Sequence, residues 1–273
     1  MRGDRLAAVL LWGAALLTLG VLLALVGHVL ARGLPVVDRE FLMARPSSMG
    51  RAGGIFPTVV GTVALAALAV AVAAPLGVGT AIYLAEYTRR GRLVEMIRFA
   101  TDSLAGVPSI LFGLFGFLLF VVRLGLGWSV LSGGLTLAVM ILPTIIRTAE
   151  EAIRAVPESY REVSYALGGT TGQTVVRVVL PSALPGILTG ILLGVGRSAG
   201  ETAAVIFTAG TALRLPRSLL DPARSMSVHF FILAREGISP DNAYGTAAVL
   251  VLAITAVNLT AYWLLQRFQA RRH

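Results

Sequence analysis

Hydrophobic residues lie in long unbroken blocks along this chain, separated by polar segments rich in arginine, proline and glycine. At 1.5 Å per residue, a helix of about 20 apolar residues crosses the roughly 30 Å hydrocarbon core of a bilayer. The pattern therefore predicts one membrane domain over residues 1–273, an all-α polytopic bundle of about six spans. The predicted spans are residues 6–31, 55–85, 104–122, 130–146, 183–208 and 247–265.

The first block follows Arg2 and Arg5, a basic start that a secretory signal peptide would share. The apolar core of a signal peptide runs about 7 to 15 residues. Because this block is longer, we expect an uncleaved first span.

Prolines within the blocks predict bends. Pro75, followed by Gly77 and Gly79, predicts a long or tilted second span that bends near its last third. Pro108 interrupts the third span early, where we expect a packing kink rather than a broken helix that offers its backbone to a substrate.

Composition excludes several classes of protein. The chain is 56% hydrophobic and only 14% charged, against roughly 25% charged in soluble domains. All 23 basic residues are arginine, so a Walker A lysine and a Schiff-base lysine are excluded, and nucleotide chemistry must belong to a partner. There is no cysteine, and His28, His229 and His273 are too scattered to indicate a metal site. The chain is therefore not expected to be an enzyme.

The net charge of +9 is compatible with an anionic substrate or nucleic acid, but arginines at membrane borders explain it more simply. The short segment 86–103 carries Arg89, Arg90, Arg92 and Arg98, whereas the short segment 123–129 carries only Arg123. The positive-inside rule therefore places segment 86–103 and both termini in the cytoplasm.

The cytoplasmic segment 147–181 contains signals for two short helices. Pro157 suits a first helical position, and the spacing of Tyr160, Val163 and Leu167 predicts an amphipathic helix that ends at Gly168. Thr170 and Gln173 then match a capping box that opens a second helix, expected to stop at Pro181. Such a pair forms either a docking surface or two helices lying on lipid headgroups.

The residue motif in this segment favours a docking surface. It reads Glu-x5-Gly-x9-Val-x-Leu-Pro from Glu162 to Pro181 and resembles the EAA loop of bacterial ABC importer permeases, with Val163 and Ser164 replacing the two alanines. In that family, the helix of the loop fits a groove on the ATPase subunit and transmits its closure to the membrane helices. The resemblance implies that the residues that couple to the ATPase are Glu158, Glu162, Ala166 and Gly168.

Further motifs narrow the resemblance to the A subunit of phosphate-specific ABC importers. They lie at residues 53–55, 75–77, 83–87, 106–110, 196–203, 207–209, 215–219 and 228–229. The resemblance implies a type I importer permease in the bacterial inner membrane. It also implies a second permease subunit, a dimer of ATPases that hold ATP and Mg, and an external phosphate-binding protein. No cofactor is expected in this chain.

Two charges fall inside the predicted fifth span. Arg197 and Glu201 are four residues apart, so on one helix they would share a face and could pair. A charge at the bilayer centre costs roughly 2.5 to 3.5 kcal/mol, so two charged residues there indicate a functional role rather than an incidental one. We expect a substrate pathway in which Arg197 binds an oxyanion, Glu201 tunes it, and Ser198 and Thr202 supply hydroxyls. The alternative is an ion pair that braces two helices.

Other functions remain open at this stage. The EAA-like loop does not report the substrate, so a permease for sulfate, molybdate or tungstate is the first alternative. A secondary transporter would need no ATPase and no docking loop. A membrane-embedded enzyme would require a cluster of carboxylates or histidines at membrane depth, where the sequence offers Glu201.

Overall fold

The computed structural model describes residues 2–88 and 91–270, and these residues are mainly helical. Arg89, Arg90 and His273, named above, lie outside them. Within the described residues, five helices are long and apolar enough to cross a membrane, or six if one bent pair is counted as a span. The five are α1 (Arg2–Gly33), α3 (Phe56–Ile82, extended by the π-helical turn η3, Tyr83–Tyr87), α6 (Val130–Arg154), α9 (Leu180–Gly200) with the turns that precede it, and α12 (Pro240–Ala270).

Short elements occupy the segments expected to be loops. Between α1 and α3 lie η1 (Leu34–Val36), α2 (Arg39–Met43), β1 (Pro46–Ser47), η2 (Ser48–Gly50) and β2 (Ala52–Gly53). The two strands pair antiparallel, with Pro46 opposite Gly53. Before α12 lies α11 (Met226–Arg235), whose Met226, Val228 and Leu233 are buried.

The predicted third span is wrong in its start and in its shape. It is a bent pair, in which α4 (Arg92–Ala105) meets α5 (Ser109–Gly116) and the π-helical turn η4 (Phe117–Arg123) at 104°. Pro108 caps α5 with an extended ψ of 139°, so the chain leaves the helical path there. The expected packing kink is therefore a break between two helices, and only the part after Pro108 runs with the apolar bundle.

The predicted fifth span is also wrong at both ends. The helix does not stop at Pro181, because α8 (Thr171–Thr174), the π-helical turn η5 (Val175–Val179) and α9 form one long helix. A local π turn is one way in which a membrane helix accommodates proline. At the other end, α9 stops at Gly200, Glu201 is extended with ψ of 130°, and the short helix α10 (Ala203–Thr208) follows.

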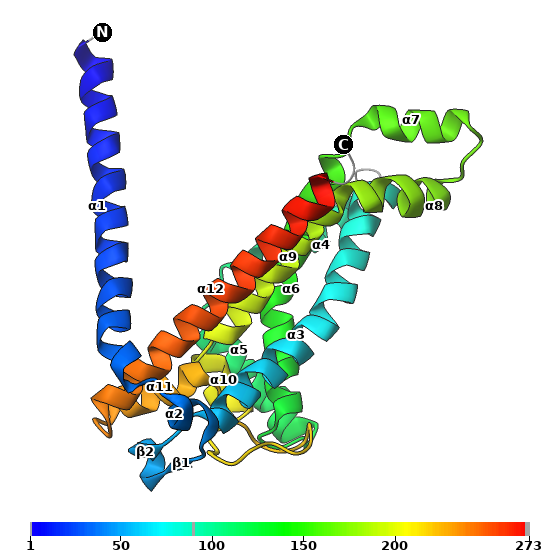
Figure 1. Cartoon of the computed structure of the whole chain (residues 1–273). Helices are drawn as coiled ribbons and strands as arrows, with labels where there is room; N and C mark the ends of the chain where they lie inside the picture. The colour runs from blue at the N-terminus through cyan, green and yellow to red at the C-terminus, as the bar shows by residue number, and fades with distance from the viewer. Residues whose placement is uncertain (1, 89–90, 271–273) are drawn as a thin grey trace.

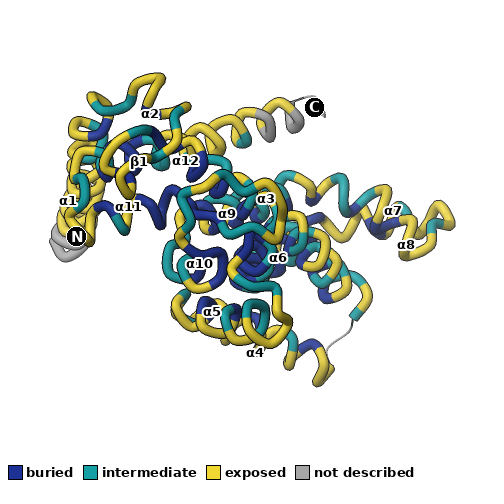
Figure 2. Tube along the Cα trace, turned by 90° about the horizontal axis from the view of Figure 1, so that it is seen from below, coloured by how far each residue is buried: buried dark blue, intermediate teal, exposed yellow. Residues whose placement is uncertain are grey.

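The core forms where α3, α6 and α9 pack against one another (Figures 1 and 2). Leu65 of α3 and Ile141 and Ile145 of α6 are almost completely buried. Glycines allow close approach of these helices, since a side chain on Gly190 would overlap Thr148. In contrast, α1 stands apart from this bundle and contacts the first part of α12 (Figure 1).

The two ends of the bundle carry different elements. The start of α1, the end of α12 and the helix α7 (Glu158–Ala166) lie at one end, whereas β1, β2 and α11 lie at the other (Figure 1). At this second end, buried Arg224 hydrogen-bonds the carbonyl oxygen of Thr211 at 2.7 Å and Nδ1 of buried His229 at 3.3 Å. One face of α11 is therefore part of the interior, while Phe230 and Phe231 remain on the surface.

Candidate functional site

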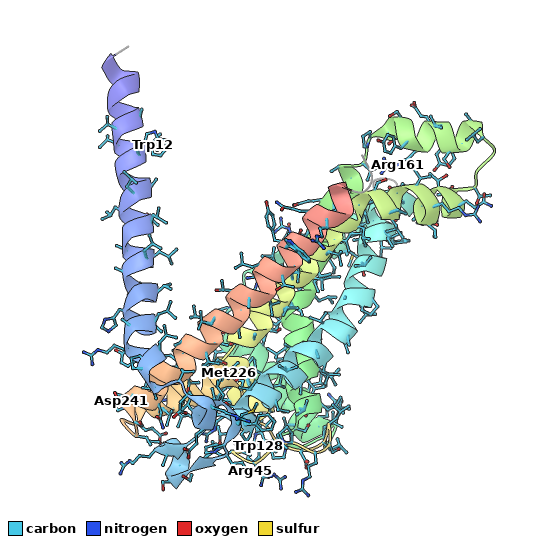
Figure 3. The ribbon with its side chains drawn as sticks, in the orientation of Figure 1. Trp12, Arg45, Trp128, Arg161, Met226 and Asp241 are labelled. Carbon is cyan, nitrogen blue, oxygen red and sulfur yellow. The ribbon has the colours of Figure 1, made fainter. Side chains whose placement is uncertain are left out.

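The helix α7 lies beyond the ends of the long helices and runs beside α8 (Figures 1 and 3). It starts at Glu158, one residue later than the sequence predicts, with Pro157 at its N-cap, and its end is closed by Gly168 in a left-handed conformation with φ of +81°. The capping box at Thr170 and Gln173 is confirmed, because both of its reciprocal hydrogen bonds form. A hydrogen bond of 2.8 Å between Ser164 and Thr174 ties the two helices together.

Apolar side chains on α7 and its end are left uncovered. Val163 is 60% exposed and Leu167 is 84% exposed. Together with α8 they border a groove of about 590 Å³, lined by Tyr160, Val163, Ser164, Leu167, Gly168, Gly169, Gln173, Arg177 and Val178. Uncovered apolar surface of this kind marks an interaction site.

All four residues predicted to couple to an ATPase are exposed, and of these Gly168 lines the groove. Glu158, Glu162 and Ala166 are spaced by four, so they follow one face of α7, and Gly168 lies just past its end. A Cβ added to Gly168 would meet no atom, so within this chain the limit on substitution there is its positive φ.

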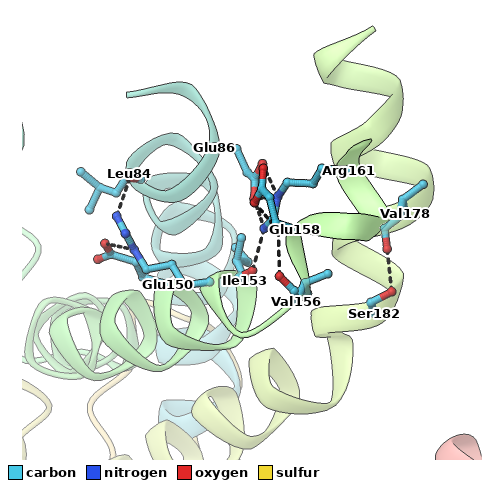
Figure 4. A network of polar contacts seen from close by, with 10 residues as sticks. Leu84, Glu86, Glu150, Ile153, Val156, Glu158, Arg161, Val178 and Ser182 are labelled. Carbon is cyan, nitrogen blue, oxygen red and sulfur yellow. Dashed lines mark hydrogen bonds and ion pairs between the residues drawn. The ribbon is translucent and has the colours of Figure 1, made fainter. Parts of the chain in front are cut away.

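The buried side of α7 carries Arg161, which the sequence reading did not single out. Its guanidinium is bound to the carboxylate of Glu86, at the end of α3 (Figure 4). Arg161 Nη2 donates to Glu86 Oε1 at 2.7 Å, and Nε donates to both carboxylate oxygens at 3.2 and 3.3 Å. The hydrogen bond with Glu86 raises the pKa of Arg161 above its ordinary value, so the arginine stays charged.

A second cluster of ion pairs joins α4 to α6 near the same end. Arg98 contacts Glu150 at 2.7 Å, Arg147 contacts Asp102 at 3.4 Å, and Arg154 contacts Glu150 at 3.0 Å. Arg154 also donates to the carbonyl oxygen of Leu84 at 3.2 Å. Arg98 entered the sequence analysis as a signal of topology, and the structure gives it a specific acidic partner.

The predicted pairing of Arg197 with Glu201 is wrong. The helix that would have placed them on one face ends at Gly200, and no ion pair joins them within the described residues. The carboxylate of Glu201 instead accepts a hydrogen bond from the backbone N–H of Ala204 at 3.3 Å, and so caps α10. Its carbonyl oxygen accepts from the Ser227 hydroxyl at 2.7 Å.

The two predicted hydroxyls also serve the local backbone. Ser198 is buried, and its hydroxyl donates to the carbonyl oxygen of Val195 at 2.9 Å. Thr202 sits at the start of α10, and its carbonyl oxygen accepts from Ile206. Arg197 itself is exposed on the surface of the chain, with no acidic partner among the described residues.

Long apolar helices, with α7 projecting past one end, define a multi-span membrane protein. Residues 74–273 match the family described as binding-protein-dependent transport system inner membrane component. The chain belongs to this family, whose members are transport components of the inner membrane.

Curated relatives match nearly the whole chain. A probable ABC transporter permease protein, YqgI, of Bacillus subtilis is 34% identical over 96% of this chain and 94% of its own length. Phosphate transport system permease protein PstA 1 of Mycobacterium tuberculosis is 38% identical over 81% of this chain and 73% of its own. PstA of Xylella fastidiosa is 33% identical over 93% and 92%.

Solved structures share the fold. The inward-facing MetNI methionine ABC transporter matches with a TM-score of 0.66 at 18% identity, over 78% of this chain and 95% of that one. A bacterial ABC transporter that imports the acidic polysaccharide alginate matches with a TM-score of 0.61 at 16% identity, over 94% and 95%. The architecture is therefore that of an ABC importer permease.

Proposed function

We propose that this chain is the A-type permease subunit of an ATP-driven importer of inorganic phosphate. The observation that carries the proposal is its relation to proteins named phosphate transport system permease, at 38% and 33% identity over most of the chain. The low-identity structural neighbours are a methionine ABC transporter and an ABC transporter that imports alginate, so the fold alone leaves the substrate open.

In this proposal, ATP is hydrolysed by a separate dimer of ATPase subunits that hold ATP and Mg. Two observations support a separate ATPase. The apolar groove beside α7 is uncovered, and the sequence has no lysine for a phosphate-binding loop. Glu158, Glu162, Ala166 and Gly168 contact the ATPase. A second, related permease completes the pathway, and an external binding protein delivers the phosphate.

The pathway in this chain passes Arg197. Arg197 lies in the last turn of α9 and has no acidic partner among the described residues, and a charged guanidinium is costly where it faces lipid. It therefore faces the second permease or the aqueous pathway, where its fork of donors suits a phosphate oxyanion. Glu201, Ser198 and Thr202 shape the backbone next to it.

The test is uptake by the complex of this permease with its co-purifying ATPase, second permease and binding protein, reconstituted in proteoliposomes. We expect uptake of radiolabelled phosphate to require ATP and to be blocked by excess unlabelled phosphate but not by sulfate, molybdate or tungstate. Competition by one of those three would assign a different oxyanion. Uptake driven by an ion gradient without ATP would contradict the proposal altogether.

We propose that both termini, together with α7, lie in the cytoplasm. Single cysteines test this cleanly because the chain has none of its own. Ser47 in β1 and Ser159 in α7 are both exposed and lie at opposite ends of the bundle. We expect Ser47→Cys, but not Ser159→Cys, to react with an impermeant thiol reagent added to intact cells. The reverse pattern would invert the topology.

A further inference from the structure

Arg161 and Glu86 form a buried ion pair between α7 and the end of α3. Their side chains are only 9% and 4% exposed, respectively, and two nitrogens of the guanidinium donate hydrogen bonds to the carboxylate (Figure 4). Such a fork-shaped contact fixes the direction of approach as well as the distance. The pair therefore holds one definite geometry between the two helices.

The same guanidinium also holds the end of α6. Arg161 Nη1 donates to the carbonyl oxygen of Val156 at 2.8 Å, and Nη2 donates to that of Ile153 at 3.0 Å. Glu158 contacts Nη1 from the solvent side at 3.3 Å. One side chain of α7 thus joins the last turn of α6 to the last turn of α3.

This junction is the buried part of α7. Arg161 is the one buried residue within that helix, and the other face is exposed. The chain itself, the Ser164–Thr174 hydrogen bond to α8 and packing against η5 also link α7 to its surroundings. A displacement of α7 by a docked partner therefore reaches α3 directly through Arg161 and Glu86.

Two observations argue against a purely stabilising role. A buried ion pair is often no more stabilising than apolar side chains of similar volume, so its presence here calls for another reason. Glu86 also lies in the π-helical turn η3, a kind of local widening that is common at functional sites. A π turn can shift without breaking the long helix that contains it.

We propose that Arg161 is a positioning residue that transmits the movement of α7 to α3 through Glu86, and so links ATP hydrolysis to opening of the pathway. This rests on the proposed docking of α7 against an ATPase. The ion pair connects α7 to one end of α3, and the other end of α3 packs beside α11. A shift of α3 would therefore be felt along the length of the core.

The test compares uptake per ATP hydrolysed in the reconstituted complex. The main variant is the double substitution Arg161→Gln with Glu86→Gln, since removing one partner alone would leave a buried unpaired charge. We expect this variant to assemble with the ATPase and to hydrolyse ATP, while uptake per ATP falls by about tenfold or more. Arg161→Lys keeps the charge without the fork and should recover part of the ratio.

Arg154→Gln is the matched control. Arg154 also donates to the last turn of α3, at Leu84, but comes from α6 and makes no contact with Glu86. If the end of α3 needs only to be held in place, both variants should lower the ratio equally, and the proposal would be overturned.

The remaining outcomes are also decisive. An unchanged uptake per ATP in the double variant would overturn the proposal. Loss of ATPase binding in the double variant, with binding kept in the unsubstituted complex, would also overturn it, because the pair would then serve to keep α7 folded for docking. If the unsubstituted complex binds no ATPase, it is the proposed function that fails, and the two failures are thereby told apart.

Discussion

Gly168→Asp is expected to abolish ATP-driven uptake while the membrane domain folds and inserts normally. Gly168 ends α7 with φ of +81°, a conformation that is open to glycine and unfavourable by about 1 to 2 kcal/mol for most other residues. A side chain there meets no atom of this chain, so the fold itself loses little. An aspartate would instead project a charge into the surface that the ATPase covers.

Gly168→Asn is the matched control, because asparagine has the same shape without the charge and tolerates the left-handed conformation best after glycine. We expect the Asn variant to keep a substantial part of uptake and the Asp variant to lose it, with similar amounts of both in the membrane. The measurements are uptake and ATP hydrolysis by purified complexes. Normal uptake by the Asp variant would show that α7 does not dock.

The sequence predicts the start of α7 and the second capping box because local backbone chemistry decides both. Pro157 has no backbone N–H to donate and favours a helix start, which falls one residue later, at Glu158. Thr170 and Gln173 satisfy the start of the next helix without help from distant residues. Block length also predicts the long helices, because any helix that crosses the bilayer must be apolar over that length.

The sequence predicts less well where a helix ends or continues within an apolar block. Pro108 ends one helix and starts another at a 104° bend, whereas Pro181 lies inside a continuous helix. The two prolines are chemically identical, and what differs is whether a π turn and neighbouring helices accommodate the ring. That information is tertiary and does not appear in a hydrophobic pattern.

The sequence reading named residues on one side of α7 only. The resemblance to the EAA loop implied Glu158 and Glu162, and their spacing of four places both on one exposed face of the helix. Arg161 and Glu86 are 75 positions apart, and no periodicity relates them. The signal that was present is physical: a carboxylate at the end of an apolar span requires a cationic partner or water.

Arg197→Gln is expected to lower phosphate uptake by at least about tenfold, because a hydrogen bond to a charged group is worth roughly 1.5 to 3 kcal/mol. Since Arg197 has no acidic partner among the described residues, its loss should leave no stranded charge, and assembly should be unaffected.

The control for this prediction is Arg123→Gln, which removes an exposed arginine at the end of η4. The measurements are uptake in proteoliposomes and the amount of assembled complex. The double variant Arg197→Gln with Glu201→Gln separates the two roles of Arg197, since Glu201 caps α10 here and does not pair with it. If the arginine contacts the anion, removing both charges leaves uptake absent. If the two residues pair in another state of the transporter merely to brace it, the neutral double variant recovers uptake, and Arg197 is not a substrate contact.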